Sequence, residues 1–249
     1  MPLPPLKDQF DALLRLPSIS CTQADLDQSN LPVVELLASW LNDLGFECRI
    51  LPIANQPGKA NLLASFGSGP GGLVMAGHTD TVPCNPERWQ HDPFALTEAN
   101  NRWYGLGSCD MKGFFPLIIE AVRSYLNQPF KHPLIILATA DEESSMSGAR
   151  ALVAVDFSQA RHAIIGEPTG MRPIRLHKGI MMERIDIIGQ AGHSSDPGLG
   201  HNAMEAMHAV ISDLLQLRGS WQKRWSNPLF GVPTPTLNLG CIHGGDNPN

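Results

Sequence analysis

The sequence places one imidazole and several carboxylates at points where apolar runs end or helical patterns begin. The candidate groups are His78, Asp80, Asp110, Asp141, Glu142, Glu143 and Glu167. Intervals of 32, 33 and 24 residues separate the four stretches that carry them, so these groups cannot be neighbours on one helix. They can meet only where several strand ends converge. One imidazole with several carboxylates is a ligand set typical of zinc, cobalt or manganese, unlike a thiolate-rich structural site.

Each stretch also has a simpler interpretation. His78 could be a loop or core residue, Asp110 could cap the helix that follows it, and Glu167 could end a strand. The acidic run 141–143 could be a solvated turn. Their joint occurrence at strand exits and helix starts argues against four coincidences. Many acids in one pocket would repel one another, and a bound dication would remove that penalty and lower their pKa values. We therefore expect a metal centre, with Asp80 orienting the imidazole.

Three short apolar runs lead into the candidate groups. Residues 72–77, 134–140 and 162–166 are continuously apolar, which is typical of strands buried on both faces of a sheet. A helical pattern from Met111 to Leu126 lies between the first two runs. Alternation of strands and helices predicts an α/β architecture, in which ligand sites gather at the carboxyl ends of the strands.

Other segments carry helical or strand patterns. Residues 8–16 and 31–44 have helical apolar spacing. After Glu167 the pattern changes: Met182–Gly189 alternates like a strand, His201–Arg218 is an amphipathic helix, and Thr236–Ile242 is strand-like. We place a domain boundary near Arg175–Gly179. The second unit stops within a motif, so we expect this chain to be a fragment.

Composition excludes several classes of protein. The chain has 249 residues, 43% apolar and 17% charged, with a formal net charge of −6, which argues against a nucleic-acid or anionic-membrane partner. No apolar run approaches the roughly 20 residues of a membrane span. The first residues lack the basic and apolar regions of a secretory signal. Five scattered cysteines with no Cys-x-x-Cys pair favour a reduced, cytoplasmic chain.

Five motifs resemble those of the M20 family of two-zinc amidohydrolases and peptidases. They are Gly77–Pro83 (GHTDTVP), Tyr104–Gly113 (YGLGSCDMKG), Asp141–Glu143 (DEE), Gly166–Thr169 (GEPT) and Ala191–Ser195 (AGHSS). The resemblance covers nearly the whole chain. It implies a zinc-peptidase-like catalytic domain whose mixed, largely parallel sheet is flanked by helices. It also implies an inserted α+β lid and dimerisation domain, incomplete here. We assign residues 1–176 to the catalytic domain and 177–249 to the lid.

The resemblance also implies a role for each acidic group. Asp110 would bridge two divalent metal ions, zinc or cobalt. His78 and Glu167 would complete the shell of one ion, and Glu143 would bind the other. Glu142 would be the general base, and Asp80 would orient His78. Cys109, beside Asp110, could offer a thiolate, but the matching family position is not a ligand.

Residues of the second domain receive roles by the same resemblance. His193 would stabilise the oxyanion from the lid of a partner subunit, so we expect a homodimer formed through the lid. The helix at 201–218 could instead pack only on its own sheet. Lys178 is a candidate partner for a substrate carboxylate, although a solvated lysine explains it as well. The loop Gly244–Asn247 resembles a substrate-contacting loop, with Asn247 as the contact, or is a plain turn.

The pattern departs from the family in one ligand. Family members have a further histidine ligand from a C-terminal segment, and none of the histidines here matches it. We therefore expect weak binding of one metal and little or no turnover by these 249 residues alone. Several stretches, such as Ala138–Glu143 and Gly192–Pro197, resemble in particular members that deacetylate a small N-acetylated amino acid. The alternatives are a desuccinylase, an aminoacylase or a dipeptidase, or a non-catalytic remnant that only dimerises or binds metal.

Overall fold

The computed structural model describes residues 3–245. The chain divides into two compact units, Met1–Arg172 and Pro173–Asn249. None of the helices in the described part of the chain is long and apolar enough to cross a membrane.

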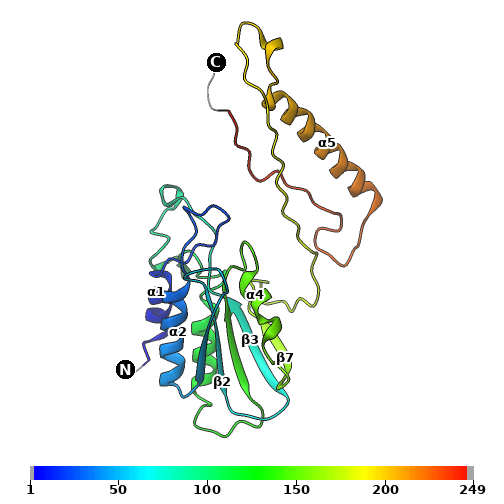
Figure 1. Ribbon diagram of the computed structural model, residues 1–249. Coiled ribbons are helices and arrows are strands. Elements are labelled where there is room, and N and C mark those ends of the chain that lie inside the picture. The colour runs from blue at the N-terminus through cyan, green and yellow to red at the C-terminus, as the bar shows by residue number, and fades with distance from the viewer. Residues whose placement is uncertain (1–2, 246–249) are drawn as a thin grey trace. The chain divides into compact units, whose positions relative to one another are not determined.

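The first unit is built on a five-stranded mixed sheet (Figure 1). Its strands are β1 (Glu47–Pro52), β2 (Ala60–Phe66), β3 (Gly72–His78), β6 (Leu134–Thr139) and β7 (Ala160–Ile165), in the spatial order β1-β2-β6-β3-β7. β2 is antiparallel to β1 and β6, whereas β3 is parallel to β6 and β7. A separate hairpin pairs β4 (Thr97–Ala99) with β5 (Arg102–Tyr104). The three apolar runs expected to be strands are β3, β6 and β7, so the strands are confirmed. Burial on both faces is wrong for β7, which lies at the edge of the sheet and is largely exposed.

The register of the parallel strands brings their carboxyl ends to one edge of the sheet. His78 at the end of β3 pairs with Thr139 at the end of β6, and Ala76 of β3 pairs with Ile165 at the end of β7. The acidic residues that follow β6 and β7 therefore lie beside His78, at the carboxyl edge of the parallel strands where ligand sites form.

Helices cover both faces of this sheet. α1 (Leu6–Leu14), α2 (Leu31–Asp43) and α3 (Phe114–Arg123) pack on one face, and their apolar side chains form the main core with β2 and β6. Leu13, Leu37, Phe115 and Ile136 are fully buried there. The opposite face is covered by the segment after β6, which includes α4 (Ser147–Ala151) and the 3₁₀ turn η2 (Leu152–Ala154). Another 3₁₀ turn, η1 (Pro86–Arg88), lies in the loop after β3.

α3 begins three residues later than the helical pattern at Met111–Leu126 predicts. Residues 107–113 form turns instead, in which the Gly113 amide donates to the Gly107 carbonyl at 3.0 Å. This loop carries Asp110, so the late start of the helix leaves that carboxylate on the loop and half exposed.

The second unit contains one long helix, α5 (Ala203–Arg224), and a 3₁₀ turn, η3 (Pro197–Leu199). Asn202 caps α5 by accepting from the amides of Met204 and Glu205. The prediction of strands at Met182–Gly189 and Thr236–Ile242 is wrong, because neither segment forms the hydrogen-bonded pairing of a β-sheet. Alternating apolar residues form a strand only beside a partner, and the pairing described in this unit is one bridge between Gln190 and His201. The expected α+β layout of the lid is therefore not evident.

Candidate metal centre

One imidazole and four carboxylates converge at the carboxyl edge of the sheet. The Nε2 atom of His78 lies 3.1 Å from Asp110 Oδ1, 3.8 Å from Glu167 Oε1 and 4.0 Å from Glu142 Oε2. Two groups of potential ligands result, His78–Asp110–Glu143 and His78–Glu142–Glu167, and within each group the ligand atoms lie within 4.8 Å of one another. The structure thus brings together the five residues that the sequence marks as ligands or general base.

The buried His78 ring is held in one orientation. Its Nδ1 donates to the main-chain carbonyl of Asp80 at 3.0 Å, and the Asp80 carboxylate lies 3.6 Å from the same nitrogen. A carbonyl can only accept, so Nδ1 carries the proton and Nε2 faces the carboxylates. Burial alone would lower the pKa of His78, but Asp80, Glu167 and the other nearby carboxylates outweigh it and raise that pKa.

Asp80 also holds the acidic turn that follows β6. Its fully buried carboxylate accepts from the amide of Glu142 at 3.2 Å and from that of Glu143 at 3.0 Å. Burial raises the pKa of Asp80, and the attraction of His78 and the two amides counteracts this only in part. One side chain therefore contacts both the imidazole and the backbone that presents the two glutamates.

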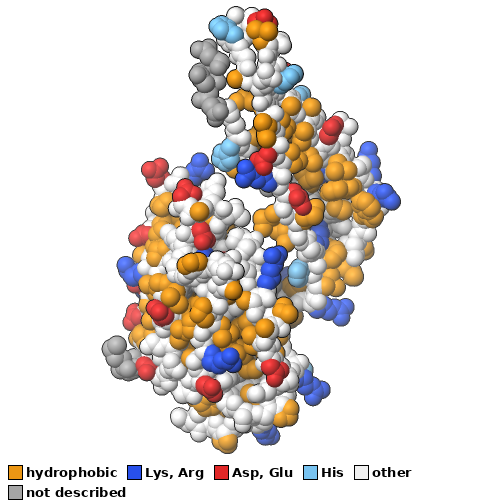
Figure 2. All heavy atoms as spheres, in the orientation of Figure 1, with side chains coloured by type: hydrophobic (Ala, Val, Ile, Leu, Met, Phe, Trp, Pro, Cys, Tyr) orange, Lys and Arg blue, Asp and Glu red, His pale blue; other side chains and the backbone are white. Residues whose placement is uncertain are grey.

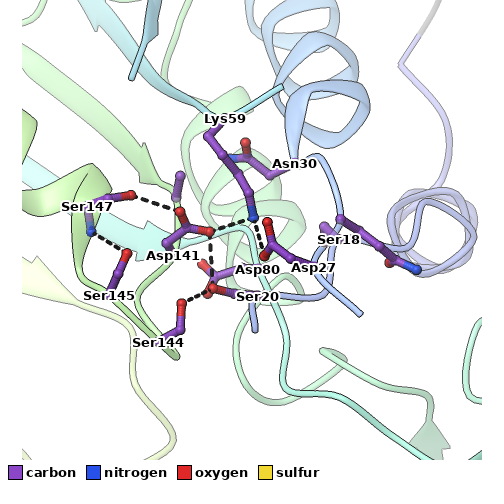
Figure 3. Close-up of polar contacts among 12 residues, drawn as sticks. Ser18, Ser20, Asp27, Asn30, Lys59, Asp80, Asp141, Ser144, Ser145 and Ser147 are labelled. Carbon is purple, nitrogen blue, oxygen red and sulfur yellow. Dashed lines mark hydrogen bonds and ion pairs between the residues drawn. The ribbon is translucent and has the colours of Figure 1, made fainter. Parts of the chain in front are cut away.

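A second buried network anchors the same turn from the other side (Figure 3). The carboxylate of Asp141 accepts from Lys59 Nζ at 2.7 Å, from Ser20 at 3.0 Å and from Ser147 at 2.8 Å. Lys59 also donates to Asp27 at 2.8 Å. Lys59 is not among the candidate residues marked by the sequence, where its one signal is a lysine directly before the largely apolar stretch of β2.

The Asp110 loop is fixed by the lysine two residues beyond it. Lys112 is 1% exposed, and its ammonium donates to the carbonyls of Leu13 and Leu16, each at 2.9 Å, where α1 ends. Burial lowers the pKa of Lys112 to about 8. A cation at a helix C-terminus is favourable because the last carbonyls carry partial negative charge.

The donor set fits a divalent cation. Burial and the charge of Asp110 raise the pKa of Glu143, and burial foremost raises the pKa of Glu167. Acids held this close resist ionisation together, and a dication among them would relieve that repulsion. A histidine nitrogen with carboxylate oxygens suits zinc or cobalt.

The remaining candidates belong to the second unit. His193 Nδ1 accepts from the amide and the hydroxyl of Ser195, at 3.1 and 2.8 Å. Lys178 donates to the Thr234 carbonyl at 2.7 Å, beside a cavity of about 410 Å³ lined by Trp225 and Phe230. Asn247 lies outside the described residues.

More than half of the chain, residues 74–223, matches the family described as Peptidase family M20/M25/M40. The chain belongs to this family. The stretch contains all five residues of the centre, from His78 to Glu167, together with His193. The family expected from the motifs is therefore confirmed, while the roles of individual residues remain predictions.

Curated relatives match along almost the entire chain. It is 52% identical over 247 residues to the acetylornithine deacetylase of Salmonella arizonae, covering 99% of this chain and 64% of that protein. The acetylornithine deacetylase of Klebsiella pneumoniae is 53% identical over the same shares. The chain thus spans about 64% of the length of these relatives.

Solved structures share the fold at low sequence identity. Human carnosine dipeptidase 1 aligns with a TM-score of 0.57 and 23% identity, covering 64% of this chain and 37% of that one. A tripeptidase from Staphylococcus aureus aligns with a TM-score of 0.53 and 17% identity, covering 83% of this chain and 55% of that one. These likenesses support the α/β catalytic fold of the family.

Proposed function

We propose that this chain carries the catalytic residues of an acetylornithine deacetylase. The reaction would hydrolyse the amide of N2-acetyl-L-ornithine to L-ornithine and acetate, a step of arginine biosynthesis. The observation that carries this proposal is an identity of 51–53% to proteins of that name, over 98–100% of this chain. The convergence of His78 with four carboxylates supports it, because amide hydrolysis at neutral pH needs an activated carbonyl and an activated water.

Five residues would hold and serve two divalent cations, zinc or cobalt. His78, Asp110 and Glu167 would bind one ion, and Asp110 and Glu143 would bind the other. When bound, a cation supplies Lewis-acid chemistry that polarises the scissile carbonyl. Glu142 takes a proton from the attacking water and delivers it to the leaving amine.

Supporting residues keep these groups in place or complete the site. Asp80 holds the backbone of Glu142 and Glu143 and faces His78. His193 of a partner subunit would stabilise the oxyanion, which makes the working form a homodimer through the lid. Lys178 would pair with the substrate carboxylate, and Asn247 would contact the substrate.

The test measures turnover of the protein isolated from its own source. Acetate release from N2-acetyl-L-ornithine is compared with hydrolysis of N-succinyl-diaminopimelate, N-acetylmethionine and a dipeptide, each with added zinc or cobalt. We expect N2-acetyl-L-ornithine to give the highest kcat/KM. Preference for another substrate would refute the deacetylase assignment within the family.

A variant distinguishes the general base from a metal ligand. Glu142→Gln keeps the size of the side chain and removes its basicity. We expect it to abolish turnover while cobalt binding stays within about threefold of wild type, since a base contributes on the order of 10²–10⁴-fold to rate without holding the ion. Loss of cobalt binding would instead make Glu142 a ligand, as its place in the second ligand group would allow.

A further inference from the structure

We propose that Lys59 is a positioning residue for the metal centre: its buried ammonium fixes, through Asp141, the turn that presents Glu142 and Glu143. The inference deepens the proposed function and rests on it for the identity of the reaction. It does not depend on which acylated amino acid is the substrate.

The ammonium of Lys59 joins two parts of the chain to the turn. Its side chain is 5% exposed, and Nζ lies 2.7 Å from Asp141 Oδ1 and 2.8 Å from Asp27 Oδ1. Lys59 comes directly before β2, Asp27 lies in the loop before α2, and Asp141 follows β6. Figure 3 shows the Lys59 side chain reaching to the two carboxylates, with its ammonium between Asp141 and Asp27. These segments lie 32 and 82 residues apart in the sequence, so the contact ties the turn to distant elements.

The Asp141 carboxylate has a donor on each oxygen. Oδ1 accepts from Lys59 and Ser20, and Oδ2 accepts from Ser147. Ser20 also contacts the hydroxyl of Ser144, the residue that follows Glu143 in the sequence. Asp141 itself has a φ of 55°, in the left-handed region that non-glycine residues adopt only when their surroundings determine it. The network holds this backbone conformation together with the Met146 amide, which donates to the Asp141 carbonyl at 2.7 Å.

The turn has two anchors, and each fixes a different part of it. Asp80 binds the amides of Glu142 and Glu143 from the side of the imidazole. Lys59 and the serines bind the side chain of the preceding Asp141. Two anchors on three consecutive residues define both the position and the direction of the turn, and so where the Glu142 and Glu143 carboxylates point.

Removal of Lys59 would change this geometry through charge. Asp27 and Asp141 share one ammonium, and without it two carboxylates would face each other, one buried and one one-third exposed. Like charges that share no cation repel strongly where water is excluded, so the two carboxylates would move apart. That movement releases the Asp141 side chain and lets the turn shift. The Glu143 carboxylate would then move away from His78 and Asp110, the other two potential ligands of its group.

A purely structural ion pair predicts something different. Buried ion pairs can often be replaced by apolar groups with little loss of stability, provided that both charges are removed together. If Lys59 served stability alone, removing both partners would restore the fold and the metal site alike. If Lys59 positions the turn, removing both partners would restore stability and leave the metal site impaired.

The experiment compares four variants in cobalt binding and thermal stability. They are Lys59→Met, Asp141→Asn, the double variant of the two, and Lys59→Arg, with Lys7→Met as the matched control. Lys7 forms an exposed ion pair with Glu98 on the surface, far from any of these contacts in sequence. Cobalt(II) alone is the probe, its Kd is measured by calorimetry, and the visible absorption of the bound ion reports its ligand geometry.

We expect Lys59→Met to weaken cobalt binding by about tenfold or more, as loss of groups that orient ligands does, and to alter the cobalt spectrum. The double variant leaves only Asp27 without the ammonium, and that carboxylate is one-third exposed to water. It should therefore regain the melting temperature of wild type but not its cobalt affinity. Lys59→Arg, which keeps the charge, should bind cobalt within about threefold of wild type, and Lys7→Met should match wild type. In the isolated protein, kcat should fall in Lys59→Met and the double variant with KM little changed.

Three results would overturn the proposal. They are wild-type cobalt affinity in folded Lys59→Met, recovery of affinity and stability together in the double variant, and no cobalt binding by the wild type. If Lys59→Met does not fold, the cobalt affinity of the double variant, whose net charge equals that of wild type, decides between the two roles of Lys59. Turnover of a different acylated amino acid would overturn only the proposed substrate, because the cobalt comparison would still decide the role of Lys59.

Discussion

The buried ammonium of Lys112 should make the stability of this protein rise with pH in alkaline solution. Burial lowers the pKa of Lys112 from 10.5 to about 8. In the unfolded chain this lysine keeps its ordinary pKa, so between these two values the unfolded state binds more protons than the folded one. Stability increases with pH wherever the unfolded state binds more protons. Below pH 8 both states are charged, and the folded state carries the full cost of the desolvated cation.

The size of the effect follows from the two pKa values. The difference between 10.5 and about 8 corresponds to about 3 kcal/mol at 25 °C, gained progressively between pH 8 and pH 10.5. The variant Lys112→Met removes the titrating group and keeps a long, unbranched side chain in the same space. Its loss of the hydrogen bonds to Leu13 and Leu16 lowers stability at every pH of the assay, because the ammonium and the neutral amine can both donate them.

The assay is denaturant unfolding of wild type and Lys112→Met at pH 7, 8, 9 and 10.5, followed by circular dichroism. Subtracting the variant's curve of unfolding free energy against pH from that of wild type removes the contributions of all other titrating groups. We expect wild type to gain about 3 kcal/mol of unfolding free energy relative to the variant across this range. Lys7→Met is the control: Lys7 is exposed, and its hydrogen bond to Glu98 raises its pKa, so its difference curve should show no such gain. A flat difference curve for Lys112→Met would refute the reasoning.

Three further substitutions test the centre. Asp80→Asn leaves one backbone amide of the acidic turn facing an NH₂ group, so cobalt affinity should fall about 10–100-fold by calorimetry, and an unchanged Kd would contradict this. Gly166→Ala would press a methyl group into the Phe114 ring beside Glu167, lowering stability by about 1–3 kcal/mol in thermal unfolding, whereas Gly179→Ala, with open space around it, should not. Cys109→Ala should leave cobalt affinity unchanged, because its thiol belongs to neither ligand group, and a tenfold loss would show that it binds the ion.

The sequence predicts those parts of the fold in which a local run or spacing of apolar residues indicates a buried element. The run 134–140 is almost wholly apolar because β6 is central and covered on both faces, and the run of β3 beside it is largely buried too, whereas the apolar run of β7 lies at the sheet edge and is largely exposed. The helices at 31–44 and 201–218 show their apolar faces in the same local way. β1 escaped prediction because it is short and largely exposed, and its existence depends on pairing with β2.

The second unit shows the opposite error. Alternation at 182–189 is a genuine strand pattern, yet a strand also needs a neighbour to accept its backbone hydrogen bonds, and spacing within one segment does not reveal whether a neighbour exists. The isolated bridge between Gln190 and His201 is the extent of the pairing described there.

The candidate site divides along the same line. His78, Asp110, Glu143 and Glu167 could be found because each carries chemistry directly at an element boundary. Lys59 and Asp27 could not be found in this way, because they act through contacts with residues up to 82 positions away in the sequence. Nothing in a lysine's immediate sequence says that its ammonium will be buried between two carboxylates.

The position of β7 at one edge of the sheet gives the centre unequal mobility. Among the residues that the structure describes, β3 and β6 each have partners on both sides, and they lead to His78 and to the Glu142–Glu143 turn. β7 pairs there with β3 alone and leads to Glu167. Ile164 and Ile165 of β7 are 48% and 66% exposed, so this strand also has little packing to resist local unfolding. In hydrogen exchange, the amides of β7 should therefore open before those of β6. If Glu167 binds an ion as proposed, it would be the ligand that the ion gains last and loses first, while the imidazole and the glutamate turn stay in place.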